Sequence, residues 1–85
     1  MDFNAFATVL VERLGLEDVP ALQPWVGMFD DLGIDSFQAF EVLIIIETAA
    51  GLDVPPPELP EIFTLGDAFE YYQAARALAV AAVAE

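Results

Sequence analysis

Histidine, cysteine and lysine are absent from this chain of 85 residues. Their absence excludes the ordinary Ser-His, Cys-His and Schiff-base mechanisms, because each needs one of these side chains as base or nucleophile. Carboxylates, hydroxyls and two tyrosines remain, and paired-carboxylate catalysis needs a cleft that a few short helices rarely provide. The sequence therefore predicts a protein that is not an enzyme and has no catalytic residues. Without cysteine there is no disulfide framework, which fits the reducing cytoplasm in which we expect the protein.

Positive charge is also scarce. Arg13 and Arg76 stand against fifteen acidic residues, and the net charge is −13. A domain of this charge repels phosphate backbones, so a nucleic-acid partner is not expected. The same field attracts basic partners and raises the rate at which they meet the protein. A simpler interpretation, in which the acids only keep the protein soluble, explains the composition equally well.

Long hydrophobic runs are missing too. The apolar run at residues 42–46 has Glu41 and Glu47 at its ends and is far shorter than the ~20 residues of a membrane span. The chain begins MDFNAF, with an acid where a secretory signal carries basic residues, so no signal peptide is expected. Hydrophobic residues make up 58% of the chain, which is too many for a disordered segment. We expect a single folded, monomeric domain over residues 1–85, with no membrane partner.

The spacing of apolar residues predicts an all-α fold. A first helix is expected over residues 3–14, with Asp2 or Asn4 as the N-cap and Gly15 at its end. Its apolar residues recur at the helical interval, and they are Phe3, Phe6, Leu10 and Leu14.

Residues 15–34 are predicted to form a long loop, because prolines and glycines interrupt any regular helix there. A loop of this length has to be held by its own side chains. The apolar candidates for this role are Leu16, Val19, Leu22, Trp25, Val26, Phe29 and Leu32.

The second predicted helix opens at Asp35 and Ser36. Gln38, three residues after Asp35, can complete a capping box with it. The helix should end near Ala50, with Gly51 as the residue that follows its last turn.

The last part of the chain is predicted to be helical again. Residues 53–60 hold four prolines and should form an extended connection, followed by one short turn of helix at residues 61–63. The last helix should begin at Thr64, with Asp67 as its capping-box partner. Its inner stripe is expected to consist of Leu65, Ala68, Phe69, Tyr72, Ala75, Ala79 and Val83. The fold class is thus a small four-helix bundle of three main helices and one short one, with a long loop between the first two.

One run of acids could be taken for a calcium loop, since Asp30 and Glu41 occupy its first and twelfth positions. Its third and fifth positions, however, are Leu32 and Ile34, and Asp35 replaces the glycine that the turn needs. No dedicated metal site is therefore expected.

A tight glycine turn leads into the second helix through the sequence DLGIDSF, residues 31–37. It delivers Asp35 and then Ser36 to a helix N-terminus, where a serine is exposed. A phosphate group on its hydroxyl would lie near free N–H groups and the positive end of the helix dipole. From this physics alone, the simpler interpretation is that Asp35 or Ser36 only caps the helix.

The DLGIDSF run closely resembles the phosphopantetheine attachment motif of the acyl carrier protein family, usually written LGxDSL, with Phe37 in the place of its last leucine. The order of elements, the length and the acidity agree with that family over nearly the whole chain. The resemblance implies that a phosphopantetheinyl transferase moves 4'-phosphopantetheine from coenzyme A to Ser36, beside Asp35. The arm would then carry an acyl or aminoacyl group as a thioester, so the working thiol is not a cysteine of the chain. Other implied partners are acyl- or aminoacyl-loading enzymes, ketosynthase or condensation enzymes, and a thioesterase.

The resemblance also implies that the second helix is the element that partner enzymes recognise. The residues that match partner-binding positions are Phe37, Phe40, Glu41, Ile44 and Glu47. Helical geometry supports this, because positions 37, 40, 41, 44 and 48 share one face and positions 39, 42, 43, 46 and 50 share another. The alternative is that Phe40 and Ile44 are ordinary core residues and that the two glutamates belong to a solvated face.

The cargo is less sharply indicated. The triplet before Ser36, together with Glu41, resembles acyl carriers more than peptidyl carriers. Phe37, Trp25 and the stretch VPPPELPE depart from a primary fatty-acid carrier and favour a specialised polyketide or mixed polyketide and non-ribosomal peptide pathway. A free-standing peptidyl carrier, a primary fatty-acid carrier and an acidic helical adaptor that carries nothing stay open as alternatives.

Overall fold

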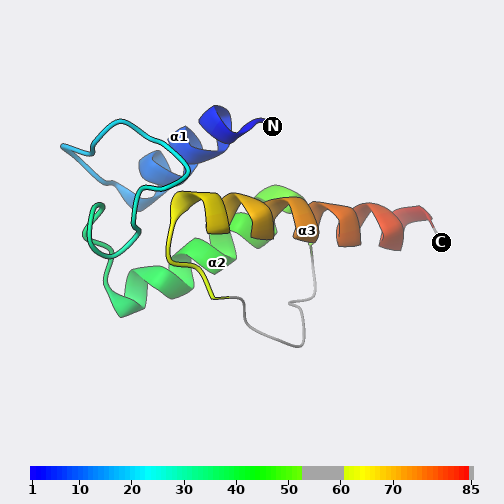
Figure 1. The fold of residues 1–85 in the computed structure, drawn as a ribbon. Coiled ribbons are helices and arrows are strands. Elements are labelled where there is room, and N and C mark those ends of the chain that lie inside the picture. Colours follow the sequence, from blue (N-terminus) through cyan, green and yellow to red (C-terminus); the bar gives the residue numbers. More distant parts are fainter. Residues whose placement is uncertain (53–60, 85) are drawn as a thin grey trace.

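A computed structural model describes residues 1–52 and 61–84, with side chains to residue 81. These residues form three α-helices, α1 (Phe3–Leu14), α2 (Ser36–Ala50) and α3 (Leu65–Ala84), and no strand. Each helix packs against the other two. In Figure 1, α3 crosses α2, and its last turns extend beyond the other helices. The all-α class and the bounds predicted for the first two helices are confirmed.

Local capping sets the ends of α1 and α2. The carboxylate of Asp2 accepts a hydrogen bond of 2.8 Å from the first turn of α1, and Gly15 ends the helix in a left-handed conformation with φ 67°. The capping box predicted for α2 is present: the backbone N–H of Gln38 donates to Asp35 at 2.7 Å, and the N–H of Asp35 donates to the Gln38 side chain at 3.2 Å. Gly51 ends α2 with φ 77°. A cap of this kind stabilises a helix by about 1 kcal/mol.

The buried core combines residues of all three helices with four residues from the segment between α1 and α2. The most completely buried large side chains are Leu10, Val42, Ile46 and Leu65, and burying such a side chain stabilises the fold by about 1.5–3 kcal/mol. The ring of Phe6 in α1 packs against two aromatic rings of α3. Its centroid lies 5.5 Å from that of Phe69 and 5.3 Å from that of Tyr72.

The stripe predicted for the last helix is mostly confirmed. Its buried members are Leu65, Ala68, Tyr72, Ala75 and Ala79, and Phe69 packs partly buried against the core. The side chain of Val83 lies outside the described residues. None of the helices formed by residues 1–52 and 61–84 combines the length and hydrophobicity that crossing a bilayer demands.

The segment between α1 and α2 contains turns but no helix. Val26 and Leu32 are buried as predicted, together with Met28 and Ile34. The prediction that Trp25 and Phe29 hold this segment is wrong, because these side chains are 74% and 42% exposed. The backbone at Gly27 pairs with the distant Thr64, and its neighbours Val26 and Met28 are buried in the core, whereas Trp25 and Phe29 lie in the turns on either side.

The short helix predicted at residues 61–63 is absent, and the described residues form three helices where four were expected. This segment runs extended and pairs antiparallel with the earlier one at Gly27 and Thr64. The N–H of Met28 donates to the carbonyl of Phe63 at 2.8 Å. That pairing satisfies backbone groups that a single helical turn would leave free at both ends. The predicted connection at 53–60 lies outside the described residues.

The last helix starts one residue later than predicted, at Leu65, because Thr64 is its cap. The N–H of Asp67 donates to the Thr64 hydroxyl at 3.1 Å, and the N–H of Thr64 donates to the Asp67 carboxylate at 3.1 Å. The predicted pairing of Thr64 with Asp67 is therefore confirmed.

Candidate functional site

Ser36 is the first residue of α2, and its side chain is exposed. The backbone on its N-terminal side is fixed by two features. Gly33 turns the chain with φ 70°, and Ile34 is buried, with its N–H donating to the carbonyl of Met28 at 3.1 Å. Asp35 provides the cap of the helix. The cap therefore does not depend on the Ser36 hydroxyl, which leaves that group available for another role.

The surroundings of Ser36 determine what its hydroxyl can do. The chain has no histidine, and an unassisted serine hydroxyl is a weak nucleophile. The Ser36 hydroxyl therefore has no histidine of its own chain to activate it. Once formed, a phosphate ester here would lie at the positive end of the α2 dipole. Among the residues that the structure describes, no group of three or more acids is placed to hold a metal ion.

The two faces predicted for α2 differ in exposure as expected. Phe37, Phe40 and Ile44 are 74%, 61% and 63% exposed, and we refer to these three residues as the α2 stripe. On the other face Val42 and Ile46 are buried. The alternative that Phe40 and Ile44 are core residues is therefore wrong.

Neither acid predicted to bind partners is fully exposed, since Glu41 and Glu47 are half-buried. The Tyr71 hydroxyl of α3 donates to the carboxylate of Glu47 at 2.6 Å. Burial raises the pKa of Tyr71 well above its usual value, and the hydrogen bond to Glu47 and its negative charge add to this effect. Glu47 thus holds α2 to α3, a role that its sequence position does not reveal.

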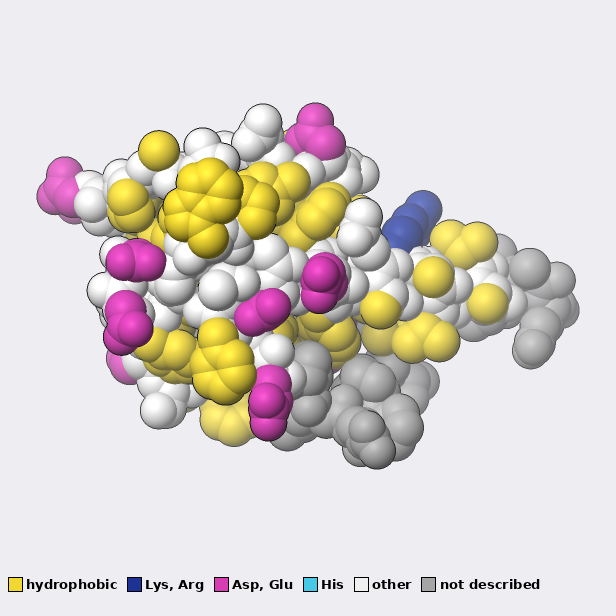
Figure 2. All heavy atoms as spheres, viewed as in Figure 1, with side chains coloured by type: hydrophobic (Ala, Val, Ile, Leu, Met, Phe, Trp, Pro, Cys, Tyr) yellow, Lys and Arg dark blue, Asp and Glu magenta, His cyan; other side chains and the backbone are white. Residues whose placement is uncertain are grey.

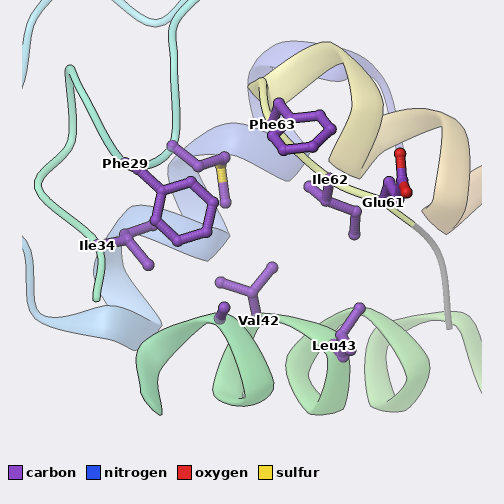
Figure 3. Close-up of a pocket in the computed structure, with 9 residues that line it drawn as sticks. Phe29, Ile34, Val42, Leu43, Glu61, Ile62 and Phe63 are labelled. Atoms are coloured by element: carbon purple, nitrogen blue, oxygen red, sulfur yellow. The ribbon is translucent and has the colours of Figure 1, made fainter. Parts of the chain in front are cut away.

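An apolar pocket of about 270 Å³ lies against the first part of α2, and Ser36 itself does not line it. Its lining residues are Met28, Phe29, Ile34, Ala39, Val42, Leu43, Glu61, Ile62 and Phe63. In Figure 3, Phe29 and Ile34 lie at one end of the pocket and Leu43 and Glu61 at the other, with α2 as its floor. No local sequence pattern indicates this pocket, because it depends on the pairing of residues 26–28 with residues 63–65.

No protein-family model matches the chain, and no solved structure matches it.

Three features lie along the first part of α2. Ser36 offers an exposed hydroxyl on a fixed backbone, the pocket lies between Ile34 and Leu43, and the α2 stripe starts at the next residue, Phe37. An engineered apolar cavity of about 150 Å³ is large enough to bind benzene. A pocket of about 270 Å³ is therefore large enough for an apolar group of moderate size.

Proposed function

We propose that this protein is an acyl carrier protein that bears 4'-phosphopantetheine on Ser36 and serves a specialised polyketide or mixed polyketide and non-ribosomal peptide pathway. The observation that carries the proposal is the position of Ser36 within DLGIDSF, exposed at the first residue of α2 while Asp35 supplies the cap. Ser36 is also the single serine of the chain.

The residues around Ser36 suit such an arm. The hydroxyl is exposed, and the first turn of α2 offers N–H groups and a positive dipole end to a phosphodiester. When bound, the arm supplies the thiol that holds an acyl group as a thioester. The chain itself presents the hydroxyl. It has no histidine or lysine to take the proton, and the carboxylate of Asp35 is engaged in the helix cap, so we expect the transferase to supply the base.

The pocket favours an acyl cargo over an aminoacyl one. Of its lining side chains, only Glu61 is charged, and the others are hydrophobic. An alkyl chain gains free energy from leaving water throughout such a pocket, whereas the ammonium of an aminoacyl group would find a partner at Glu61 alone and would lose its hydration elsewhere. The free-standing peptidyl carrier is therefore the weaker alternative.

The α2 stripe is suited to the enzymes that have to reach Ser36. Exposed apolar side chains gathered in one place commonly mark an interaction site, and Glu41 lies directly beside Phe40 in the sequence. The strong negative charge steers basic surfaces towards the protein. The phosphopantetheinyl transferase, the loading enzymes, the ketosynthase or condensation enzymes and the thioesterase would share this docking surface.

The proposal is tested by intact-mass measurement after incubation with coenzyme A and a broad-specificity phosphopantetheinyl transferase. We expect the wild type to gain the mass of one phosphopantetheine and Ser36→Ala to gain none. Ser36→Ala should stay folded, because the cap belongs to Asp35, and circular dichroism can verify this. Thr48→Ala removes another exposed hydroxyl of α2 and should be modified like the wild type. A wild type of unchanged mass would favour the acidic adaptor, and a modified Ser36→Ala would show that the attachment site is wrong.

A further inference from the structure

Trp25 lies on the surface and has no role in the site around Ser36. With Phe37, it is the most exposed of the large apolar side chains that the structure describes, at 74%. It is not among the residues that line the pocket, and it belongs to the segment between α1 and α2. Figure 2 shows a hydrophobic area over this segment where it passes the start of α3, separated by acidic side chains from a second area nearer α2.

The backbone on both sides of Trp25 is fixed. The carbonyl of Pro24 accepts a hydrogen bond of 2.8 Å from Gly66, and the carbonyl of Val26 accepts one of 2.9 Å from Leu65. The side chain of Val26 is buried in the core. An exposed indole on a fixed backbone loses little freedom on binding, and tryptophan is among the residues that dominate interface energies.

The charges around Trp25 indicate the chemistry of what binds there. Residues 19–29 carry no charge, although the whole chain has a net charge of −13. Exposed acids flank this neutral stretch in the sequence on both sides, Glu17 and Asp18 before it and Asp30 and Asp31 after it. An apolar centre with a charged rim is the usual anatomy of a protein interface.

We infer that Trp25 anchors a docking surface for a basic protein partner, which receives the indole in an apolar pocket and meets the flanking acids with lysine or arginine side chains. A second copy of this chain does not fit, because it carries fifteen acids and two arginines and would be repelled. An anionic membrane is repelled for the same reason. The inference is independent of Ser36 and of the proposed carrier function.

The experiment selects binders from a display library of random peptides on the full-length protein. We expect the enriched peptides to combine lysine or arginine with leucine, isoleucine or phenylalanine. Trp25 is the single tryptophan of the chain, so its fluorescence reports on this position alone and should shift to the blue as a selected peptide removes it from water. Trp25→Ala should weaken binding at least about tenfold, and joint replacement by Glu17→Gln and Asp30→Asn should weaken it several-fold at low salt.

Matched variants keep this surface distinct from the site around Ser36. Leu78→Ala removes an exposed apolar side chain of α3 and should leave unchanged the binding of those peptides that shift the Trp25 fluorescence, as should Ser36→Ala. The inference would be overturned if no enriched peptide shifts this fluorescence, or if the peptides that do shift it are acidic or bind Trp25→Ala as well as the wild type. A fluorescence shift produced by raising the protein concentration alone, or by lipid vesicles, would also overturn it, because a second copy or a membrane would then be the occupant.

Discussion

The two faces of α2 contain equally hydrophobic residues but differ in what they contact. Val42 and Ile46 are buried in the bundle, whereas Phe40 and Ile44, each two positions away, are more than half exposed. A helix that is apolar on all sides is normally buried on all sides. Among the residues that the structure describes, only one apolar side of α2 is buried. The buried side stabilises the fold, whereas the exposed side does not, which suits the docking role proposed for the α2 stripe.

Among the substitutions that this comparison suggests, one on the buried face should change the free energy of unfolding most. Ile46 is fully buried among the three helices, and truncating such a side chain to alanine removes its transfer free energy and leaves a cavity. We expect Ile46→Ala to lower the free energy of unfolding by about 2–5 kcal/mol, measured by thermal or urea unfolding. A loss below about 1 kcal/mol would contradict the placement of Ile46 in the core.

The difference between the two faces could be predicted from the sequence, because it depends on helical spacing alone. The ends of α1 and α2 could also be predicted, since Asp2, Asp35, Gly15 and Gly51 act within a few residues of their own position. The position of Ser36 at the start of α2 could be predicted for the same reason, because it follows from the local motif.

What the sequence did not reveal depends on pairing between distant segments. The burial of Met28 instead of Trp25, the extended course of residues 61–63 and the pocket all follow from the contact of residues 26–28 with residues 63–65. The bond between Glu47 and Tyr71 likewise joins residues 24 positions apart. Neither contact has a local pattern that indicates it.

That pairing can be tested at Gly66, the second residue of α3. A Cβ at this position would lie 2.9 Å from the carbonyl oxygen of Pro24, so the two segments would have to separate. We expect Gly66→Ala to cost about 1–3 kcal/mol of stability, although alanine favours helices over glycine by about 1 kcal/mol. Urea unfolding measures the change. A stabilised variant would show that residues 24–28 are not held against α3.

A smaller change in stability is expected when the hydrogen bond that joins α2 to α3 is removed. Tyr71→Phe removes the hydroxyl that donates to Glu47 and should cost about 0.5–1.5 kcal/mol at neutral pH. Because the pKa of Tyr71 is raised in the folded protein, this contribution is fully present below a pH of about 10, the ordinary tyrosine pKa. It is lost as the pH rises above that value, since the unfolded chain then releases the proton first.

This loss of stability can be measured from the melting temperatures of the wild type and of Tyr71→Phe across alkaline pH. The wild type should lose stability more steeply than Tyr71→Phe, and the two curves should converge as the pH rises. Curves that run parallel would show that the pKa of the Tyr71 hydroxyl does not differ between the folded and the unfolded protein. The neighbouring Tyr72 is present in both proteins and contributes equally to each curve.

The smallest effect on stability is expected at Ile44, the exposed counterpart of Ile46. Its side chain is 63% exposed, and substitutions at such positions change the free energy of unfolding by no more than about 0.5 kcal/mol. If the α2 stripe is the docking surface, Ile44→Ala should nevertheless slow arm attachment or acyl loading by about tenfold, because truncating a central interface side chain commonly costs more than 1 kcal/mol. Ile46→Ala is the matched control, since it removes the same atoms from the other face. If Ile44→Ala proves as destabilising as Ile46→Ala, or is processed at the wild-type rate, Ile44 is not part of the recognition surface, and Phe37 and Glu41 would have to provide recognition without it.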